Sequence, residues 1–597
     1  MSTEENIGEN TGDTLQAQRR RFLAFFAGTS LSSTLLPGVL WAQVEEKKAE
    51  GITLDMVITA EKIAGVEFTP AQREMLLDGV NENHARMLRL REIPLPNSVP
   101  SCLRFSPVMP GMEFDRVRRP MKPSKAPQVK RPANLEDVAF WPVTRLAQLI
   151  RTRQVTSVEL TKMYLTRLQR YQPTLNYLIT LTEDLALKQA KQADADIAAG
   201  RYRGPLHGIP WGSKDLISRK GYKTTWGAAP YKDQMFDYDA TVMERLDAAG
   251  AVLIGKLSSG ELAGGDTWFG GQTKNPWNPE EGSSGSSAGP ASATSAGCVG
   301  FAIGTETGGS IVGPSTRCGV YGMRPTYGRV SRHGVMTLAW SLDKIGPICR
   351  SVEDCALVLD ALHGPDGRDL TVTELPFNWD AGTDIRKLRV GYLKAAFDEP
   401  RPVQEEKDND AAALDKLRSM GVTLKPIAFP DLPIADMLAV MYTEFAAAFD
   451  DLTRSHRDDL LARKDRTGDA NLYRTDRFVP AVEYLQGTRL RTLLMEAMAI
   501  TMSDIDVYLA PITSVRPGAA GAGAPPQPAR RSLVNLNTTM TNMTGNPGVV
   551  VRNGFNAKGQ PTSMTFIGRV YGEAKMLALA HAYQMATNWH EKHPELG

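Results

Sequence analysis

The sequence is poor in cysteine and lacks the patterns in which cysteine and histidine bind metals. Five cysteines are scattered over 597 residues without a C-x-x-C pair, and no H-E-x-x-H motif occurs. These absences argue against a disulfide-stabilised scaffold and against a zinc site. The odd count leaves at least one thiol unpaired within the chain. We therefore expect neither a metal nor another cofactor.

The chain also lacks an excess of charge of either sign. Lysine and arginine number 69 and aspartate and glutamate 67, which leaves a formal net charge of +2. Nucleic-acid-binding proteins usually carry a clear basic excess, so we expect no nucleic-acid partner. A hydrophobic content of 42% and a charged content of 23% are ordinary for a globular protein.

Long hydrophobic runs are missing as well, so we expect no stable membrane span. The apolar segment near the N-terminus follows Arg19 and Arg20 and is interrupted at Pro37. This arrangement resembles a twin-arginine export signal with a cleavage site after Ala42. We interpret residues 1–42 as such a signal and expect a periplasmic or secreted protein. An uncleaved anchor or a cytoplasmic tail is the alternative.

Residues 43–137 are expected to form a helical extension followed by a proline-rich strap. Apolar residues recur at helical spacing in 52–92, and Thr69 followed by Pro70 is a typical helix start. Nine prolines occur between residues 94 and 132, a density that sustains neither a helix nor an inner strand. We expect the two helices to pack on the main domain, because their apolar faces need cover.

From residue 138 onward, helical patterns alternate with short apolar runs. The segments 146–155 and 156–172 have helical periodicity, whereas AVLIGK, DVYLAP and PGVVVR are typical of buried strands. Alternating helices and apolar strands favour an α/β sheet covered by helices on both faces. The Gly/Ala/Pro-rich segment 516–531 is predicted to be a loop inside this unit.

The segment 280–297 contains two serine pairs, and the question is which serine is reactive. Gly285 to Gly289 fit G-x-S-x-G, which would make Ser287 the nucleophile of a Ser-His-Asp esterase. That motif requires a preceding strand, and we do not expect NPWNPEEGS to form a strand of the sheet. The esterase is therefore the weaker alternative, although candidate bases lie downstream at His333, His363, His456 and His581.

Several separated motifs, in order, resemble the amidase signature family. They are GIPWGSKDL at 208–216, the Ser/Gly-rich region at 285–297, and GTETGGSIVGPSTRCGVYGMRPTYGRVSRHG at 304–334. The likeness continues through segments 341–362, 506–517 and 567–587. The resemblance implies a single large domain over 138–597, with a mixed central sheet covered by helices on both faces, preceded by the N-terminal helical extension.

The resemblance also assigns the reactive residues. It makes Ser310 the nucleophile, Ser286 a bridging residue held after a cis peptide from Gly285, and Lys214 the base. Ser287 is expected to support this set. Ser283 and Ser284 fall in the preceding loop, so we expect them to be exposed and to have no chemical role.

These assignments agree with the chemistry of the residues. A serine hydroxyl is a weak nucleophile until a neighbour accepts its proton, and a lysine can do so only when burial makes it neutral. The apolar and small residues before Lys214 could bury it. Main-chain N–H groups of Thr307, Gly308 and Gly309, with that of Ser310, are expected to stabilise a tetrahedral oxyanion.

The sequence departs from the family pattern near the nucleophile. Glu306 stands where the family usually has Asp, and Val312 where it usually has Arg, although Arg317 lies five residues further on. Ser258 to Gly260 replace a more usual Asn-Met pair. Trp211 is bulky for its position and is expected to narrow the pocket.

The sequence thus predicts an exported serine amidohydrolase that cleaves a carboxamide C–N bond through an acyl-enzyme. We expect a small-molecule amide as the partner, and a homodimer is compatible with this prediction. One alternative is an amidotransferase-like subunit that works with a partner and tRNA, which export would contradict. Another is a catalytically silent binding scaffold, against which the intact Lys-Ser-Ser set argues.

Overall fold

The computed structural model describes residues 51–463, 468–513 and 532–596. The predicted export signal and the predicted loop 516–531 lie outside the described residues. Among the described residues, no helix combines the length and the apolar character needed to cross a bilayer. The chain divides into two compact units, Met1–Pro94 and Leu95–Gly597, so the proline-rich strap belongs to the larger unit.

The smaller unit contains the two predicted helices, α3 (Leu54–Ala64) and α4 (Pro70–Leu90). Thr69 begins α4 with a reciprocal capping box, in which its hydroxyl accepts from Gln72 N–H and the Gln72 side chain accepts from Thr69 N–H. Glu61 of α3 forms an ion pair with Arg73 of α4 at 2.7 Å. No residue of α4 is buried, so the expected packing of this extension on the main domain stays a prediction.

The strap is extended, as its proline content predicts. No helix or ladder strand lies between residues 95 and 134. Single polar contacts attach it to the rest of the larger unit: Asn97 Nδ2 donates to Thr337 O at 2.9 Å, and Lys122 N donates to Trp379 O at 2.9 Å.

The core of the larger unit is one eleven-stranded sheet with the order β1-β3-β2-β8-β10-β9-β14-β15-β13-β11-β12. The pairs β2/β3, β2/β8, β11/β12 and β11/β13 are parallel and the others are antiparallel, so the predicted mixed sheet is confirmed. The strands are β1 (Leu178–Leu181), β2 (Pro210–Lys214), β3 (Val252–Leu257), β8 (Phe301–Glu306), β9 (Tyr321–Arg324), β10 (Lys344–Cys349), β11 (Val390–Leu393), β12 (Leu424–Ile427), β13 (Val507–Pro511), β14 (Gly548–Phe555) and β15 (Pro561–Gly568).

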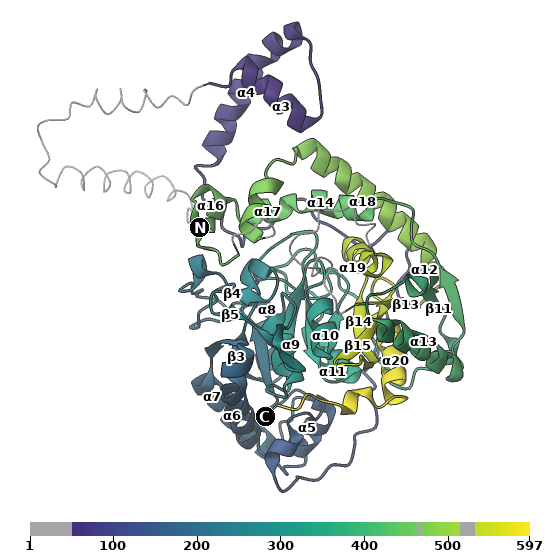
Figure 1. Ribbon diagram of the computed structural model, residues 1–597. Coiled ribbons are helices and arrows are strands. Elements are labelled where there is room, and N and C mark those ends of the chain that lie inside the picture. Colours follow the sequence, from purple (N-terminus) through teal and green to yellow (C-terminus); the bar gives the residue numbers. More distant parts are fainter. Residues whose placement is uncertain (1–50, 464–467, 514–531, 597) are drawn as a thin grey trace, which may run out of the picture. The chain divides into compact units, whose positions relative to one another are not determined.

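Helices cover this sheet (Figure 1). Seven of the sixteen described α-helices of the larger unit directly follow a strand of the central sheet along the chain. The sixteen are α5 (Val143–Arg151), α6 (Ser157–Leu175), α7 (Glu183–Ala198), α8 (Thr241–Ala248), α9 (Ala288–Ser295), α10 (Val312–Cys318), α11 (Val352–Leu362), α12 (Lys394–Asp398), α13 (Gln404–Ser419), α14 (Ile434–Met441), α15 (Thr443–Ala448), α16 (Asp450–Arg454), α17 (Asp469–Asp476), α18 (Ala481–Thr501), α19 (Leu533–Thr544) and α20 (Glu573–Met585).

Alternation along β13 shows that both faces of the sheet are buried. Val507 and Leu509 belong to one hydrophobic cluster with residues of α5 to α8, α11 and α20. Tyr508 and Ala510 point the other way and belong to a second cluster with residues of α14 to α19. The predicted α/β fold with helices on both faces is thereby confirmed.

The segment before the serine pairs forms no strand of the central sheet, as expected. It contains β7 (Asn278–Gly282), which pairs with β6 (Lys274–Asn275) in a separate two-stranded ribbon. The stretch contains Pro276 and Pro279, and a short ribbon tolerates proline where no ladder N–H is required. The ribbon is not part of the central sheet, so Gly285 to Gly289 still do not follow a sheet strand.

Candidate active site

Strand β2 lies between β3 and β8 and places Lys214 inside the protein. Every residue of β2 is buried, and Lys214 is fully buried. Its Nζ lies 2.8 Å from Ser286 Oγ, 2.8 Å from Thr305 Oγ1 and 3.2 Å from Ser287 Oγ. Because β2 and β8 are adjacent parallel strands, the Thr305 side chain of β8 reaches the lysine directly.

Burial changes the protonation of this lysine. Desolvation lowers the pKa of Lys214 well below its usual value, and the negative charges of Asp343 and Glu306 only partly oppose it. No carboxylate contacts Nζ among the described residues; its hydrogen-bond neighbours are hydroxyl groups and the Thr305 carbonyl. The amine is therefore placed to be neutral and to present a lone pair to a serine.

Ser286 follows a cis peptide bond from Gly285, the geometry that the resemblance implies. A Cβ at position 285 would lie 1.7 Å from Gly265 O, so only glycine fits there. The Ser286 carbonyl accepts from Gly260 N at 3.1 Å, and Ser287 N donates to Ser310 O at 3.0 Å. These two bonds connect the bridging serine to the loop of Gly260 on one side and to the loop of Ser310 on the other.

The Ser287 hydroxyl forms hydrogen bonds with both Lys214 and strand β8. Its hydroxyl donates to Thr305 O at 3.0 Å and accepts from Thr305 N at 3.2 Å, in addition to its contact with the lysine amine. No histidine of the described chain is hydrogen bonded to Ser287, Ser286 or Ser310. The base that a Ser-His-Asp set would require is thus missing from the neighbourhood of Ser287.

The predicted nucleophile lies in a loop between β8 and α10. Gly308 is exposed, and Gly309 and Ser310 are half-buried, so a substrate can approach them. Gly309 has φ +131, a conformation that favours glycine. Within the described residues, no acceptor takes a hydrogen bond from the main-chain N–H groups of Thr307, Gly308, Gly309 or Ser310. The four predicted oxyanion donors are therefore unoccupied.

The predicted contact of the Ser310 hydroxyl with the other two residues of the set is not formed in this structure. The Ser310 hydroxyl is hydrogen bonded neither to Ser286 nor to Lys214 within the described residues. Such contacts often tighten only when substrate is bound. The structure thus brings together Lys214, Ser286 and Ser287 and connects Ser310 to them through its backbone carbonyl.

Glu306 fixes the position of the nucleophile loop. Its Oε2 accepts from Ile311 N at 2.8 Å and from Val312 N at 2.9 Å, directly after Ser310. Its Oε1 accepts from Arg324 at 2.8 Å and from Asn542 at 2.9 Å. Although desolvation acts to raise the pKa of Glu306, the positive charges of Arg324 and Lys344 hold it below its usual value.

The structure shows the contacts near the two positions that depart from the family pattern. The longer Glu306 side chain reaches the main chain of α10 itself, and its cationic partner comes from Arg324 of β9. Arg317 does not fill this role, because it forms an ion pair with Glu281 in the β7 ribbon. Sequence reasoning missed both Arg324 and Asn542: Arg324 lies within the 304–334 motif but has no local pattern that links it to Glu306, and Asn542 lies far along the chain.

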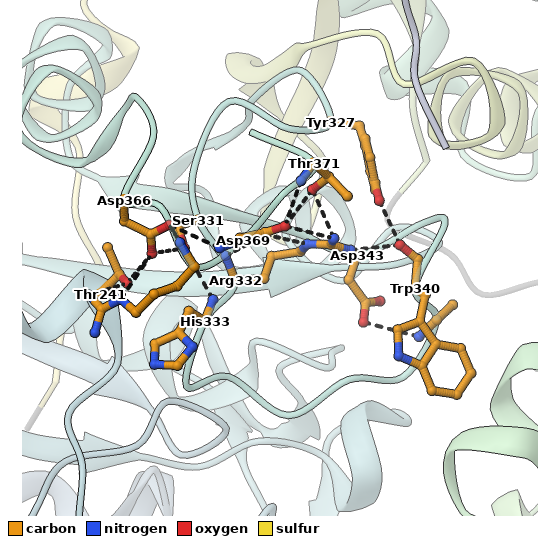
Figure 2. A network of polar contacts seen from close by, with 12 residues as sticks. Thr241, Tyr327, Ser331, Arg332, His333, Trp340, Asp343, Asp366, Asp369 and Thr371 are labelled. Atoms are coloured by element: carbon orange, nitrogen blue, oxygen red, sulfur yellow. Dashed lines mark hydrogen bonds and ion pairs between the residues drawn. The ribbon is translucent and has the colours of Figure 1, made fainter. Parts of the chain in front are cut away.

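A second network, whose part around Arg332 and Asp343 is shown in Figure 2, contacts the loop through Thr307. Thr307 Oγ1 donates to Asp343 at 2.6 Å, and Asp343 also accepts from Leu338 N and Ala339 N at 2.8 and 3.0 Å. Burial raises the pKa of Asp343 even though these donors oppose the shift. The segment that carries Asp343 is anchored through Arg332, which donates to Asp369, Trp340 O and Thr371.

Three other expectations need correction or addition. Trp211 does not narrow a pocket: it is fully buried in the core, on the face of β2 opposite to Lys214, and stacks on Phe301 at 5.9 Å. Ser283 is fully buried rather than exposed, and Ser284 has φ +63. Thr305 was missed altogether, because nothing in the sequence distinguishes its contact with Lys214 from an ordinary strand position.

Comparisons with known proteins agree with this site. The family described as Amidase matches residues 159–577. The chain is 36% identical over 488 residues to a glutamyl-tRNA(Gln) amidotransferase subunit from Methylococcus capsulatus, covering 76% of this chain and 98% of the relative. The native peptide amidase of Stenotrophomonas maltophilia superposes with a TM-score of 0.65 at 28% identity, covering 75% and 97%.

A further solved structure is an inhibitor-bound vestigial protein complex that reveals the evolutionary origins of an s-triazine catabolic enzyme. It superposes with a TM-score of 0.67 at 26% identity, covering 74% of this chain and 98% of that one. The family match spans more than half of this chain, and it includes β2, α9, β8 and α10, which carry the candidate site. The chain therefore belongs to the amidase signature family.

Proposed function

We propose that this amidase signature hydrolase cleaves a carboxamide C–N bond through an acyl-enzyme on Ser310, with Ser286 as the proton relay and Lys214 as the base. One observation carries the proposal. Lys214 is fully buried without a carboxylate contact in the described chain, and its amine lies 2.8 Å from Ser286 Oγ. A neutral amine in contact with a serine hydroxyl is a general base with a defined proton donor.

Acylation begins when Ser310 Oγ attacks the carbonyl carbon of the substrate. The Ser310 proton moves to Ser286 Oγ while the Ser286 proton moves to the Lys214 lone pair, which leaves an ammonium group. The carbonyl oxygen becomes an oxyanion, and the free N–H groups of Thr307, Gly308 and Gly309 are the donors available to it. Losing one such donor typically costs about 3–4 kcal/mol of transition-state stabilisation.

Collapse of this intermediate breaks the C–N bond. The proton held by Lys214 returns through Ser286 to the nitrogen of the leaving amine, and an ester remains on Ser310. A water molecule then attacks the ester carbonyl, and the same two residues accept its proton and return it to Ser310 Oγ. The acid is released, and Lys214 is neutral again.

We propose further that the mature protein functions outside the cytoplasm. The support is the sequence Arg19-Arg20, the apolar stretch that follows it and the predicted cleavage site after Ala42. Fractionation of cells that express the full chain, with an Arg19→Lys/Arg20→Lys variant as the control, tests this. A full-length chain found only in the cytoplasm, unchanged by the substitutions, would contradict it.

A second candidate function is that of an amidotransferase subunit. The 36% identity to a glutamyl-tRNA(Gln) amidotransferase subunit favours it. Such a subunit would need a partner and tRNA, whereas an amidohydrolase acts alone on a small amide. Hydrolysis by the isolated chain would therefore support the first candidate, and ammonia release seen only with partner subunits would support the second.

The decisive experiment is a substrate panel of carboxamides, anilides and esters with the purified chain. We expect hydrolysis of at least one carboxamide, and complete loss of it in Ser310→Ala. A panel without turnover, together with no labelling by a fluorophosphonate probe, would instead identify a catalytically silent scaffold.

A further inference from the structure

A second cavity lies at the opposite ends of the two helices that follow the candidate catalytic serines. It has a volume of 690 Å³, and Ser295 at the end of α9 and Gly319 after α10 both line it. Since α9 has eight residues, its two ends are about 12 Å apart. The strap, at residues 123–127, and the C-terminal segment, at residues 590–594, contribute further walls. The cavity is thus separate from the Ser286 and Ser310 loops.

The lining of this cavity is strongly cationic. Only three acidic side chains, Asp137, Glu353 and Glu591, line it, and Glu353 already accepts a hydrogen bond from Ser124 N at 2.6 Å. Six cationic side chains line it, and within the described residues none of them forms an ion pair with a carboxylate. These six are Lys125, Arg145, Arg151, Arg350, Arg552 and Lys592.

Two of the six cations have structural roles. Arg350 donates to the carbonyls of Trp141 and Val299, and Arg552 donates to those of Trp589 and Lys592. Neutral carbonyls do not cancel their charge, so both still add positive potential to the cavity. The remaining four cations are Lys125, Arg145, Arg151 and Lys592.

Arg145 is the best placed of these to bind a ligand. It is half-buried, and its guanidinium carbon lies 3.7 Å from the centre of the Trp141 ring. Among the described residues, no acceptor takes a hydrogen bond from its guanidinium, whose planar fork of donors matches a carboxylate. Besides Trp141, the rings of Phe140 and Tyr202 also line the cavity.

We propose that this cavity is a second ligand site, distinct from the catalytic centre, that binds an organic anion with an aromatic body, with the carboxylate held by Arg145. The volume falls in the range of small-molecule sites, which is about 300–1,000 Å³. The unpaired cations select for negative charge, and the rings select for a flat apolar body. The proposal does not depend on the reaction that the catalytic serines perform.

Calorimetric titration of the full chain with 2-naphthoate tests this site. We expect saturable binding, and binding weaker by about tenfold or more for the neutral 2-naphthylmethanol, since a charge-assisted contact contributes about 1.5–3 kcal/mol. The titration is repeated on protein treated with a fluorophosphonate, so that binding at Ser310 is not counted. Equal affinities for the acid and the alcohol would overturn the proposal.

Three variants locate the bound anion. Arg145→Gln should weaken naphthoate binding about tenfold, whereas Arg118→Gln, which removes an exposed strap arginine outside the cavity, should not change it. Glu591→Gln removes an acidic wall residue and should tighten binding. If Arg145→Gln lowers the melting temperature, the exposed Arg151→Gln replaces it. Unchanged affinity in both arginine variants would overturn the proposal.

Discussion

The two faces of the β2/β3 strand pair each bury a lysine, and the surroundings of the two lysines differ. Lys256 of β3 is fully buried and forms an ion pair with Asp215 at 2.8 Å. Lys214 of β2 is equally buried but contacts hydroxyls and one carbonyl. Desolvation lowers the pKa of both, but for Lys256 the adjacent Asp215 carboxylate opposes the shift directly.

This difference shows that burial alone does not make a lysine a base. A buried amine with a carboxylate partner keeps its proton, and the pair stabilises local structure. A buried amine without such a partner becomes neutral and can accept a proton. The presence or absence of a carboxylate is therefore the difference between the paired lysine and the proposed base on the same two strands.

Lys214→Met should have the largest effect on activity. It removes the base and leaves no neighbouring group to replace it, so kcat/KM should fall by about 10³-fold or more. The free energy of unfolding should change little, because a neutral buried amine is replaced by an apolar side chain of similar length. Steady-state kinetics and urea denaturation measure the two quantities. Lys214→Met with full activity would end the mechanism.

Lys256→Met should show the reverse pattern. It leaves the Asp215 carboxylate buried without its partner, which typically costs about 3–5 kcal/mol in the free energy of unfolding. The double variant Lys256→Met/Asp215→Asn should recover part of this loss, since the second change removes the unpaired charge. Activity per folded molecule should fall far less than in Lys214→Met. A stable Lys256→Met protein would show that the ion pair contributes little.

The pH dependence should follow the lysine without a carboxylate. The base works only when neutral, so kcat/KM should fall as the pH drops through the pKa of Lys214, which burial places well below the usual lysine value. Above that pKa the rate should stay level up to the ordinary titration range of lysine. Lys256→Met should show the same fall of kcat/KM at low pH, because Lys256 takes no part in the proposed proton transfer. If the fall of kcat/KM at low pH occurred at a different pH in Lys256→Met, the assignment of Lys214 as the base would be contradicted.

The smallest effects on stability and activity are expected for alanine substitutions in the two serine pairs, and they should differ between the pairs. Ser287→Ala leaves the buried Thr305 N–H without its acceptor and should cost about 1–3 kcal/mol in stability, with an intermediate loss of rate. Ser283→Ala removes a hydroxyl that donates only to the neighbouring Ser284 carbonyl, so both losses should be smaller. Thermal denaturation and kcat/KM of the two variants test the order. A larger loss of stability or of kcat/KM in Ser283→Ala than in Ser287→Ala would contradict this prediction.

The sequence predicted the fold and the reactive residues for different reasons. Strands such as β13 and β14 were predictable because their aliphatic runs are typical of buried strands. The strands that carry the site were not: β2 reads PWGSK and β8 reads FAIGTE, and neither contains a run of aliphatic residues as long as the VVV of β14. Lys214 and Ser310 were found only through the order of the family motifs.

What the sequence could not show is the set of contacts that holds these residues. Thr305 reaches Lys214 because β2 and β8 are neighbours in the sheet, an adjacency that no local pattern encodes. Arg324 and Asn542 meet at Glu306 from β9 and α19 for the same reason. The departure at Val312 was visible in the sequence, but the ion pair of Arg324 with Glu306 depends on tertiary structure.

Mass-spectrometric mapping of a fluorophosphonate adduct tests the central claim most directly. The chain, its Lys214→Met variant and its Lys256→Met variant are each treated with the probe, and the modified serine is located by peptide sequencing. The mechanism predicts one adduct, on Ser310, in the unchanged chain and in folded Lys256→Met, with labelling of Lys214→Met slower by orders of magnitude. An adduct on Ser287, or rapid labelling of Lys214→Met, would contradict the account.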